Sequence, residues 1–144
     1  MPDIITKEIQ AVVFSLGEEE YGIDIGKVQE IIRLPEVTRL PGTTDYVMGI
    51  INLRGSIIPI VDLKKMSMQI DSDFTDETRV IVLEIGAKKV GLIVDEVAEV
   101  INIPTELVVA SQDIGTRIQA EYLLGIARLG QRLLILLNVE RILG

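Results

Sequence analysis

The segment VVFSLGEEEYGIDIGKVQEIIRLP at 12–35 decides the fold, because the chain writes it a second time as IVLEIGAKKVGLIVDEVAEVINIP at 81–104. The two segments align without a gap at an offset of 69 residues (81 − 12). Identical residues meet at Gly17 and Gly86, Gly22 and Gly91, Val28 and Val97, Glu30 and Glu99, and Pro35 and Pro104. Most other positions pair apolar with apolar, which indicates an internal repeat.

A second block continues the repeat. YVMGIINLRGSIIPIVDLKKM at 46–66 aligns with YLLGIARLGQRLLILLNVERI at 122–142, at an offset of 76 (122 − 46). The offset grows because the second copy has a longer loop at about 105–121. Two blocks in the same order favour duplication of one unit over a chance likeness between Val- and Ile-rich segments.

Each copy predicts short strands joined by tight turns with Gly and charged residues. Ile25–Leu34 predicts a helical turn that passes into a strand, and Pro59 is expected at a sheet edge or a bulge. Asp62 and Asn138 share a repeat position before a helical fragment, which predicts that both cap a helix. The expected strands are Gln10–Leu16, Tyr21–Ile25, Met48–Leu53, Ser56–Val61, Thr78–Ile85 and Val90–Val94.

The strand pattern predicts a mainly β fold of two similar small five-stranded β-barrels packed around a shared aliphatic seam, with short helical fragments. Short strands in open sheets would leave exposed edges, and closure into barrels removes them. We expect one domain, 1–144, with a first barrel at 9–70, a linker near 67–77 and a second barrel at 78–144. Exchange of terminal strands between the barrels stays open.

Composition excludes several kinds of site. The 144 residues are 48% hydrophobic and 3% aromatic, with no Cys and no His, so we expect no thiolate nucleophile, no disulfide, no imidazole base and no structural zinc site of the usual kind. A net charge of −8 argues against nucleic-acid binding. The longest aliphatic run is Leu133–Leu137, far short of a membrane helix, and Met1–Gln10 lacks a signal-peptide pattern. The expected compartment is the cytoplasm.

Arg54 stands out because the repeat supplies an internal control. The residue opposite Arg54 is Gly130, so this hairpin turn does not require a guanidinium. Three interpretations stay open: a solvated turn residue, a tether to an acid such as Glu30, and an anchor in a protein interface. Glu30 has the counterpart Glu99, which favours a structural role for Glu30.

Several stretches resemble the CheW-like family of bacterial chemotaxis coupling proteins. The resemblance extends from about Gln10 to Leu143, and NLRG followed by an apolar run with PIVDL is its most specific motif. The stretches are EEEYGIDIGKVQEII (18–32), GIINLRGSIIPIVDL (49–63), TRVIVLEI (78–85), VGLIVDEVAEV (90–100), EYLLGIARLG (121–130) and LLILLNVERIL (133–143).

The resemblance implies a non-enzymatic adaptor built from two five-stranded barrels, with no catalytic residue, metal or cofactor. It implies binding of the helical cytoplasmic tip of chemoreceptors and of the CheW-like regulatory domain of the kinase CheA, with recruitment to membrane receptor arrays. Contacts with other CheW-like domains in rings are a further implication. Family residues carried over to this chain are Val28, Glu30, Gly49, Arg54, Val97 and Val100, and the loop around Asp113–Ile114 corresponds to a region of extra array contacts.

Side-chain alternation adds partner-binding candidates. Ile31 and Ile32 are adjacent, so in a strand one of them must leave its own barrel interior and is a candidate contact for the kinase. For Val97 and Val100, core packing and partner contact are both open. We expect a helix of the receptor tip to bind in a groove between the barrels. The adaptor would then couple the binding of its two partners with a free energy of typically about 1–3 kcal/mol.

Rival functions are weaker. An enzyme with paired carboxylates is disfavoured because Asp24 faces Ile93 and Asp95 faces Gly26 across the repeat, so no acid pair recurs. A barrel that binds oligonucleotides or sugars is disfavoured by few aromatics and negative charge. A CheW-like scaffold in a motility or surface-sensing pathway other than chemotaxis stays an alternative.

Overall fold

The computed structural model describes residues 7–42, 46–68, 73–109 and 122–143. The strands are β1 (Glu8–Leu16), β2 (Glu19–Asp24), β3 (Val28–Arg33), β4 (Val47–Leu53), β5 (Ser56–Asp62), β6 (Arg79–Ile85), β7 (Lys88–Val94), β8 (Glu96–Pro104), β9 (Val108–Val109), β10 (Leu123–Leu129) and β11 (Arg132–Leu137). The helices are α1 (Leu63–Met68) and α2 (Val139–Leu143), with 3-10 turns η1 (Ile25–Lys27) and η2 (Thr105–Leu107).

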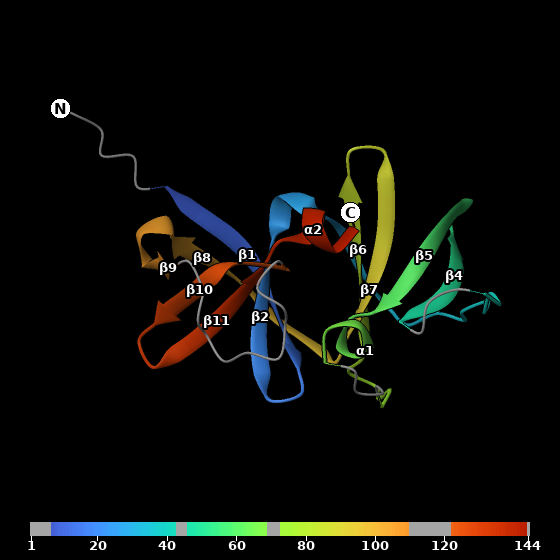
Figure 1. Ribbon diagram of the computed structural model, residues 1–144, viewed down its shortest axis with the longest axis horizontal. Coiled ribbons are helices and arrows are strands. Elements are labelled where there is room, and N and C mark those ends of the chain that lie inside the picture. The colour runs from blue at the N-terminus through green and yellow to red at the C-terminus, as the bar shows by residue number, and fades with distance from the viewer. Residues whose placement is uncertain (1–6, 43–45, 69–72, 110–121, 144) are drawn as a thin grey trace.

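The strands form two sheets that lie side by side as two lobes (Figure 1). One sheet has the order β8-β1-β2-β11-β10-β9 and is called sheet A here. The other, sheet B, has the order β3-β6-β7-β5-β4. Each sheet combines strands from both halves of the sequence. The ranges 9–70 and 78–144 are therefore units of sequence and do not each form one sheet, because β3, β4 and β5 of the first range join β6 and β7 of the second range in sheet B.

In each sheet, one continuous segment of the chain pairs with strands at opposite ends of the strand order. In sheet B, β3 pairs with β6 at one edge, and Thr38 beyond it bridges to Ile50 of β4 at the other edge. In sheet A, β8 pairs with β1, and the short strand β9 beyond it pairs with β10. Each sheet thereby closes on itself, which covers its edges as a small barrel should. The predicted fold class is confirmed.

Three apolar clusters hold the fold together. The largest lies between the sheets and joins Phe14 and Tyr21 of sheet A to Ile81 and Leu92 of sheet B, all fully buried. A smaller cluster around Val13 belongs to sheet A. A third, which includes Ile51, Ile58, Ile60, Val80, Val82 and Ile93, belongs to sheet B. The shared seam is therefore the main core, and its side chains are predominantly aliphatic.

Local predictions hold at the crossover after β2 and at Pro59. η1 covers Ile25–Lys27 and passes directly into β3, as the mixed pattern of that segment predicted. Pro59 lies in the part of β5 that pairs with β4 only, since pairing with β7 begins at Ile60. On the β7 side, Pro59 is therefore at an edge, where its missing N–H is tolerated.

Candidate partner-binding surface

The Arg54–Gly55 turn joins β4 to β5. Both turn residues have positive φ, 50° at Arg54 and 87° at Gly55, and Gly55 N donates to Asn52 Oδ1 at 3.0 Å. Turns with two positive φ values favour Asn-Gly. Among the described residues, Arg54 is the only one other than glycine with positive φ. A left-handed conformation costs such a residue about 1–2 kcal/mol, so the turn itself does not favour arginine.

The Arg54 side chain reaches the middle of β3. Its Nη2 donates to the Glu30 carboxylate, while the Arg54 side chain remains 68% exposed and that of Glu30 24% exposed. An ion pair this exposed contributes little stability. The contact therefore orients the guanidinium over β3 and leaves most of its surface open. Of the three interpretations of Arg54, the tether to Glu30 is present, and it is compatible with an interface role.

Gly49 is buried where sheet B closes. Its φ is 150°, and a Cβ built on it would lie 2.1 Å from the carbonyl oxygen of Thr38. A Cβ on its repeat counterpart, Gly125, would lie 2.7 Å from the carbonyl oxygen of Val109, at the closure of sheet A. Glycine at both positions lets the closing segment approach the strand. Gly49 thus supports the surface from beneath, and a direct partner contact there stays a prediction.

The predicted apolar residues divide into two sets. Val28 and Val97, which are repeat counterparts, are half-buried and pack against the seam between the sheets. Ile32 packs against the sheet B cluster. Ile31 and Val100, also counterparts, are 38% and 46% exposed. The expectation that one of Ile31 and Ile32 faces outward is confirmed, and Val100 is more accessible to a partner than Val97.

Ile57 and Leu133 are among the exposed apolar residues that were not predicted as candidates. Ile57 of β5 is 68% exposed, and its counterpart Leu133 of β11 is 51% exposed. The signal was in the sequence, because each is followed by another large aliphatic residue, Ile58 or Leu134, that is buried. Adjacent strand residues face opposite sides. The same argument that was applied to Ile31 and Ile32 therefore predicts an outward side chain at these positions.

Arg132 ties three strands of sheet A together. Its Nε and Nη2 donate to Glu20 of β2 at 2.8 and 3.0 Å, and Nη2 also donates to Glu99 of β8 at 2.7 Å. The hydrogen bond from Arg132 holds the pKa of Glu20 below its usual value, and the two carboxylates raise the pKa of Arg132. Glu99 is the counterpart of Glu30, so each repeat glutamate pairs with an arginine from a hairpin.

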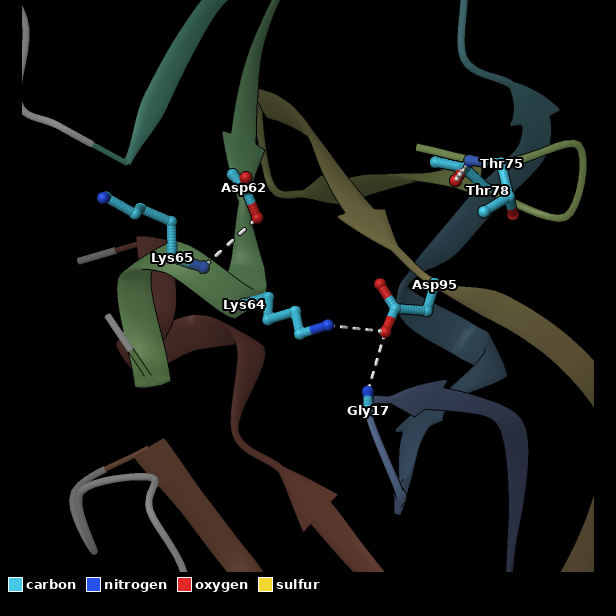
Figure 2. A network of polar contacts seen from close by, with 7 residues as sticks. All are labelled: Gly17, Asp62, Lys64, Lys65, Thr75, Thr78 and Asp95. Atoms are coloured by element: carbon cyan, nitrogen blue, oxygen red, sulfur yellow. Dashed lines mark hydrogen bonds and ion pairs between the residues drawn. The ribbon is translucent and has the colours of Figure 1, made fainter. Parts of the chain in front are cut away.

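Asp62 and Asn138 act as the predicted helix caps. Asp62 Oδ1 accepts a hydrogen bond from Lys65 N at 3.2 Å at the start of α1 (Figure 2), and Asn138 Oδ1 accepts one from Arg141 N at 3.3 Å in α2. A carboxylate oxygen in one half and an amide oxygen in the other accept the same kind of backbone hydrogen bond, which indicates that both residues act as helix caps.

Two further features of the described residues bear on other functions. No group of three or more acidic side chains in the described ranges could hold a metal ion. Within the same ranges, no helix is long and apolar enough to cross a membrane. The predicted array loop around Asp113–Ile114 lies outside the described residues, and of the longer loop at 105–121 only 105–109 are described.

Comparison with known proteins gives matches over nearly the whole chain. The family model described as "CheW-like domain" matches residues 10–144. The chain is 42% identical over 132 residues to the chemotaxis protein CheW of Klebsiella aerogenes, and the match covers 92% of this chain and 80% of that protein. Identity to CheW of Treponema pallidum is 37% over 140 residues, covering 94% and 82%.

A solved structure has the same fold. It is the scaffolding protein TtCheW from Thermoanaerobacter tengcongensis, which superposes with a TM-score of 0.85 at 38% identity and covers 92% of this chain and 86% of the other.

Proposed function

The chain belongs to the CheW-like domain family, whose matched members include chemotaxis proteins and a scaffolding protein, and on that premise we propose that it couples chemoreceptors to the histidine kinase CheA. It acts in the cytoplasm at membrane receptor arrays and catalyses no reaction of its own. Its partners are the cytoplasmic tip of the receptors, the regulatory domain of CheA and, in rings, other CheW-like domains.

Arg54 is the observation that carries the proposal. It occupies a turn position that disfavours a side chain, its counterpart is Gly130, and its guanidinium is oriented by Glu30 yet mostly exposed. Arginine held in this way loses little side-chain entropy on binding and can make several hydrogen bonds at once. Such residues are enriched among those that dominate interface energies.

The apolar residues suit two partners. A helical receptor tip presents an apolar stripe, and Val28 and Val97 lie at the seam where such a stripe would dock between the barrels. Ile31 and Val100 are exposed on β3 and β8, in different sheets, and suit contacts with a barrel of the kinase or of another scaffold. With both partners bound, the scaffold lets receptor state bias kinase activity through a coupling free energy.

The test is co-sedimentation of the chain with a receptor cytoplasmic fragment and CheA. Arg54→Gly installs the residue that the other hairpin uses, so the turn keeps its conformation while the guanidinium is lost. We expect the affinity for at least one partner to fall about tenfold or more. For Arg54→Glu the affinity should fall at least as far. The circular dichroism spectra of both variants should match that of the unmodified chain.

The matched control is Arg128→Glu, which changes an exposed arginine in the other hairpin. We expect less than about a twofold change in affinity, as for a surface charge outside the interface. If both Arg54 variants bind receptor and CheA like the unmodified chain, Arg54 is a solvated turn residue and the proposed surface is wrong. The alternative, a scaffold in another motility or surface-sensing pathway, predicts that a different kinase co-purifies with the chain.

A further inference from the structure

Two ion pairs join helices to the segments where the chain crosses between sheets. Lys64 of α1 donates from Nζ to Oδ2 of Asp95, which lies between β7 and β8, at 3.2 Å (Figure 2). Lys27 of η1, between β2 and β3, donates from Nζ to Oε1 of Glu140 of α2 at 3.0 Å. Each helix follows a strand of one sheet and holds the segment by which the chain leaves that sheet. We call these contacts latches.

The two latches are equivalent in position and opposite in charge. Lys64 and Glu140 are repeat counterparts, 76 residues apart (140 − 64), and Asp95 is the counterpart of Gly26, next to Lys27. The helix is therefore basic in the latch of sheet B and acidic in the latch of sheet A. The first latch is the more buried, with side chains 17% and 27% exposed against 36% and 62%, and its Asp95 also accepts from Gly17 N at 2.7 Å.

Backbone pairing alone does not explain why each hairpin enters its own sheet. β5 runs parallel to β7 with Ile60 opposite Gly91, and β11 runs parallel to β2 with Leu136 opposite Gly22. Ile60 and Leu136 are counterparts, as are Gly91 and Gly22. In both places the aliphatic side chain fills the space over the glycine. The hairpin β4–β5 could thus pair with β2, and β10–β11 with β7, through the same hydrogen bonds.

That alternative arrangement would place like charges together. Lys64 would approach Lys27, and Glu140 would approach Asp95 and Glu96. Asp24, whose Oδ1 accepts from Gly26 N, offsets only part of the first repulsion. Like charges at short range disfavour an arrangement as much as opposite charges favour it.

Arg132 adds an independent contact of the same kind. In the observed arrangement Arg132 of β11 pairs with Glu20 of β2. The counterpart of Glu20 on β7 is Lys89, so β11 beside β7 would bring Arg132 to a lysine. Glu30 and Glu99 are alike and do not discriminate between the arrangements.

We infer that these reversed charges direct each hairpin and its helix to one sheet, and so select the arrangement in which β4–β5 pairs with β7 and β10–β11 pairs with β2. The apolar seam stabilises either arrangement, and the charges choose between them. Such selection against a near-degenerate alternative is needed in a duplicated fold, where similar strands compete for the same neighbours.

The decisive variant keeps both latch ion pairs attractive in the observed arrangement and makes the latch contacts of the alternative arrangement attractive as well. Lys27→Glu with Glu140→Lys reverses the latch of sheet A, so the observed arrangement retains two opposite-charge latches. In the alternative arrangement, Lys64 would then meet the acid introduced at position 27, and the base introduced at position 140 would meet Asp95. Both contacts therefore become attractive. Native and reversed latches are compared in two backgrounds, one with Arg132 and one with Arg132→Ser. Serine is the residue at the counterpart position 56.

Cysteine cross-linking reports the arrangement, because the chain has no native cysteine. Glu18→Cys with Gln131→Cys places thiols in turns that precede the neighbouring strands β2 and β11. Ala87→Cys with Gln131→Cys places them in turns of different sheets, which become neighbours only if β11 pairs with β7. Each chain is unfolded in denaturant, refolded, and treated with a short bismaleimide.

We expect the unmodified charges to give the 18–131 product and almost none of the 87–131 product. The reversed latch should raise the 87–131 fraction about threefold or more, with a larger rise in the Arg132→Ser background, since each exposed pair shifts an equilibrium by up to about fivefold. Equal 87–131 fractions with native and reversed latches in both backgrounds would overturn the inference.

A rescue variant covers failure to refold. Adding Lys64→Glu and Asp95→Lys to the reversed latch restores opposite polarities, with every latch charge inverted. If the reversed latch alone misfolds and this fourfold variant refolds, polarity is the cause and the inference holds. If both fail, local packing around the latches is the cause and the inference is wrong.

Discussion

The two closures of the fold, at Gly49 and Gly125, are alike, whereas the two hairpin turns, at Arg54 and Gly130, differ. The closures solve the same steric problem in each sheet, so the duplicated glycine persists in both. The turns would also accept the same residue, yet one carries an arginine with positive φ. Features that the halves share therefore maintain the barrel, and features that they do not share are available for binding or for selecting the topology.

The largest effect is expected where the closures themselves are filled. Gly49→Ala would place a methyl group against the backbone of Thr38, at a φ that residues with a Cβ rarely adopt, and should cost at least about 3 kcal/mol of unfolding free energy. Gly125→Ala also clashes with backbone, but a Cβ there would be farther from it, at 2.7 Å, so its cost should be smaller. Urea denaturation measures both.

Gly17→Ala separates the steric cost from the general cost of replacing a glycine. Gly17 also has positive φ, 63°, but a Cβ there would meet nothing within 4 Å. Gly17→Ala should therefore lower the free energy of unfolding by about 1 kcal/mol, which is the cost of the left-handed conformation alone. Should Gly49→Ala be no worse than Gly17→Ala, the close approach at Thr38 is not what requires glycine.

A middle-sized effect should distinguish the two valines of VAEV. Val97→Ala removes methyl groups that pack against the seam and should cost about 1 kcal/mol of unfolding free energy. Val100→Ala, at a side chain 46% exposed, should change stability by less than about 0.5 kcal/mol while weakening partner co-sedimentation. Val28→Ala is the matched change in the first half and should behave like Val97→Ala. A larger stability loss at Val100 than at Val97 would reverse their assignment.

The repeat predicted most of the fold because duplication makes one half a template for the other. The hairpins, the caps at Asp62 and Asn138 and the aliphatic seam all follow from local patterns that occur twice. The turn at Ile25–Lys27 follows from the apolar pattern of its own segment, since its counterpart at 94–96 has no such turn. Which half supplies which strand did not follow. Strand pairing depends on side chains far apart in sequence, such as Lys27 with Glu140, and equal halves offer two pairings.

For the candidate site, some contacts were predicted and others were missed. The Arg54–Glu30 contact was among the expected interpretations, because an unduplicated cation near a duplicated acid limits the choices. The Arg132 contacts with Glu20 and Glu99 were not found, since these residues come from three strands whose neighbourhood the sequence does not reveal. Ile57 was missed although alternation within its own strand exposes it.

The smallest effect concerns pH and tests the Arg132 contacts in sheet A. Because Arg132 lowers the pKa of Glu20 in the folded chain, the ionised carboxylate adds stability that is fully present above its unfolded pKa, near the ordinary value of 4.5. That contribution is lost as the pH falls through the lower, folded pKa. Arg132→Gln should flatten this part of the stability profile, measured by urea denaturation at stepped pH below 4.5.

Arg128→Gln, a matched loss of one surface charge in the same hairpin, should leave the slope of that profile unchanged. If Arg132→Gln keeps the full slope, the Glu20 carboxylate is not held by Arg132 in solution. Arg132 would then have no energetic part in directing β11 to β2, and the choice between the two arrangements would rest on the latches at Lys27 and Lys64 alone.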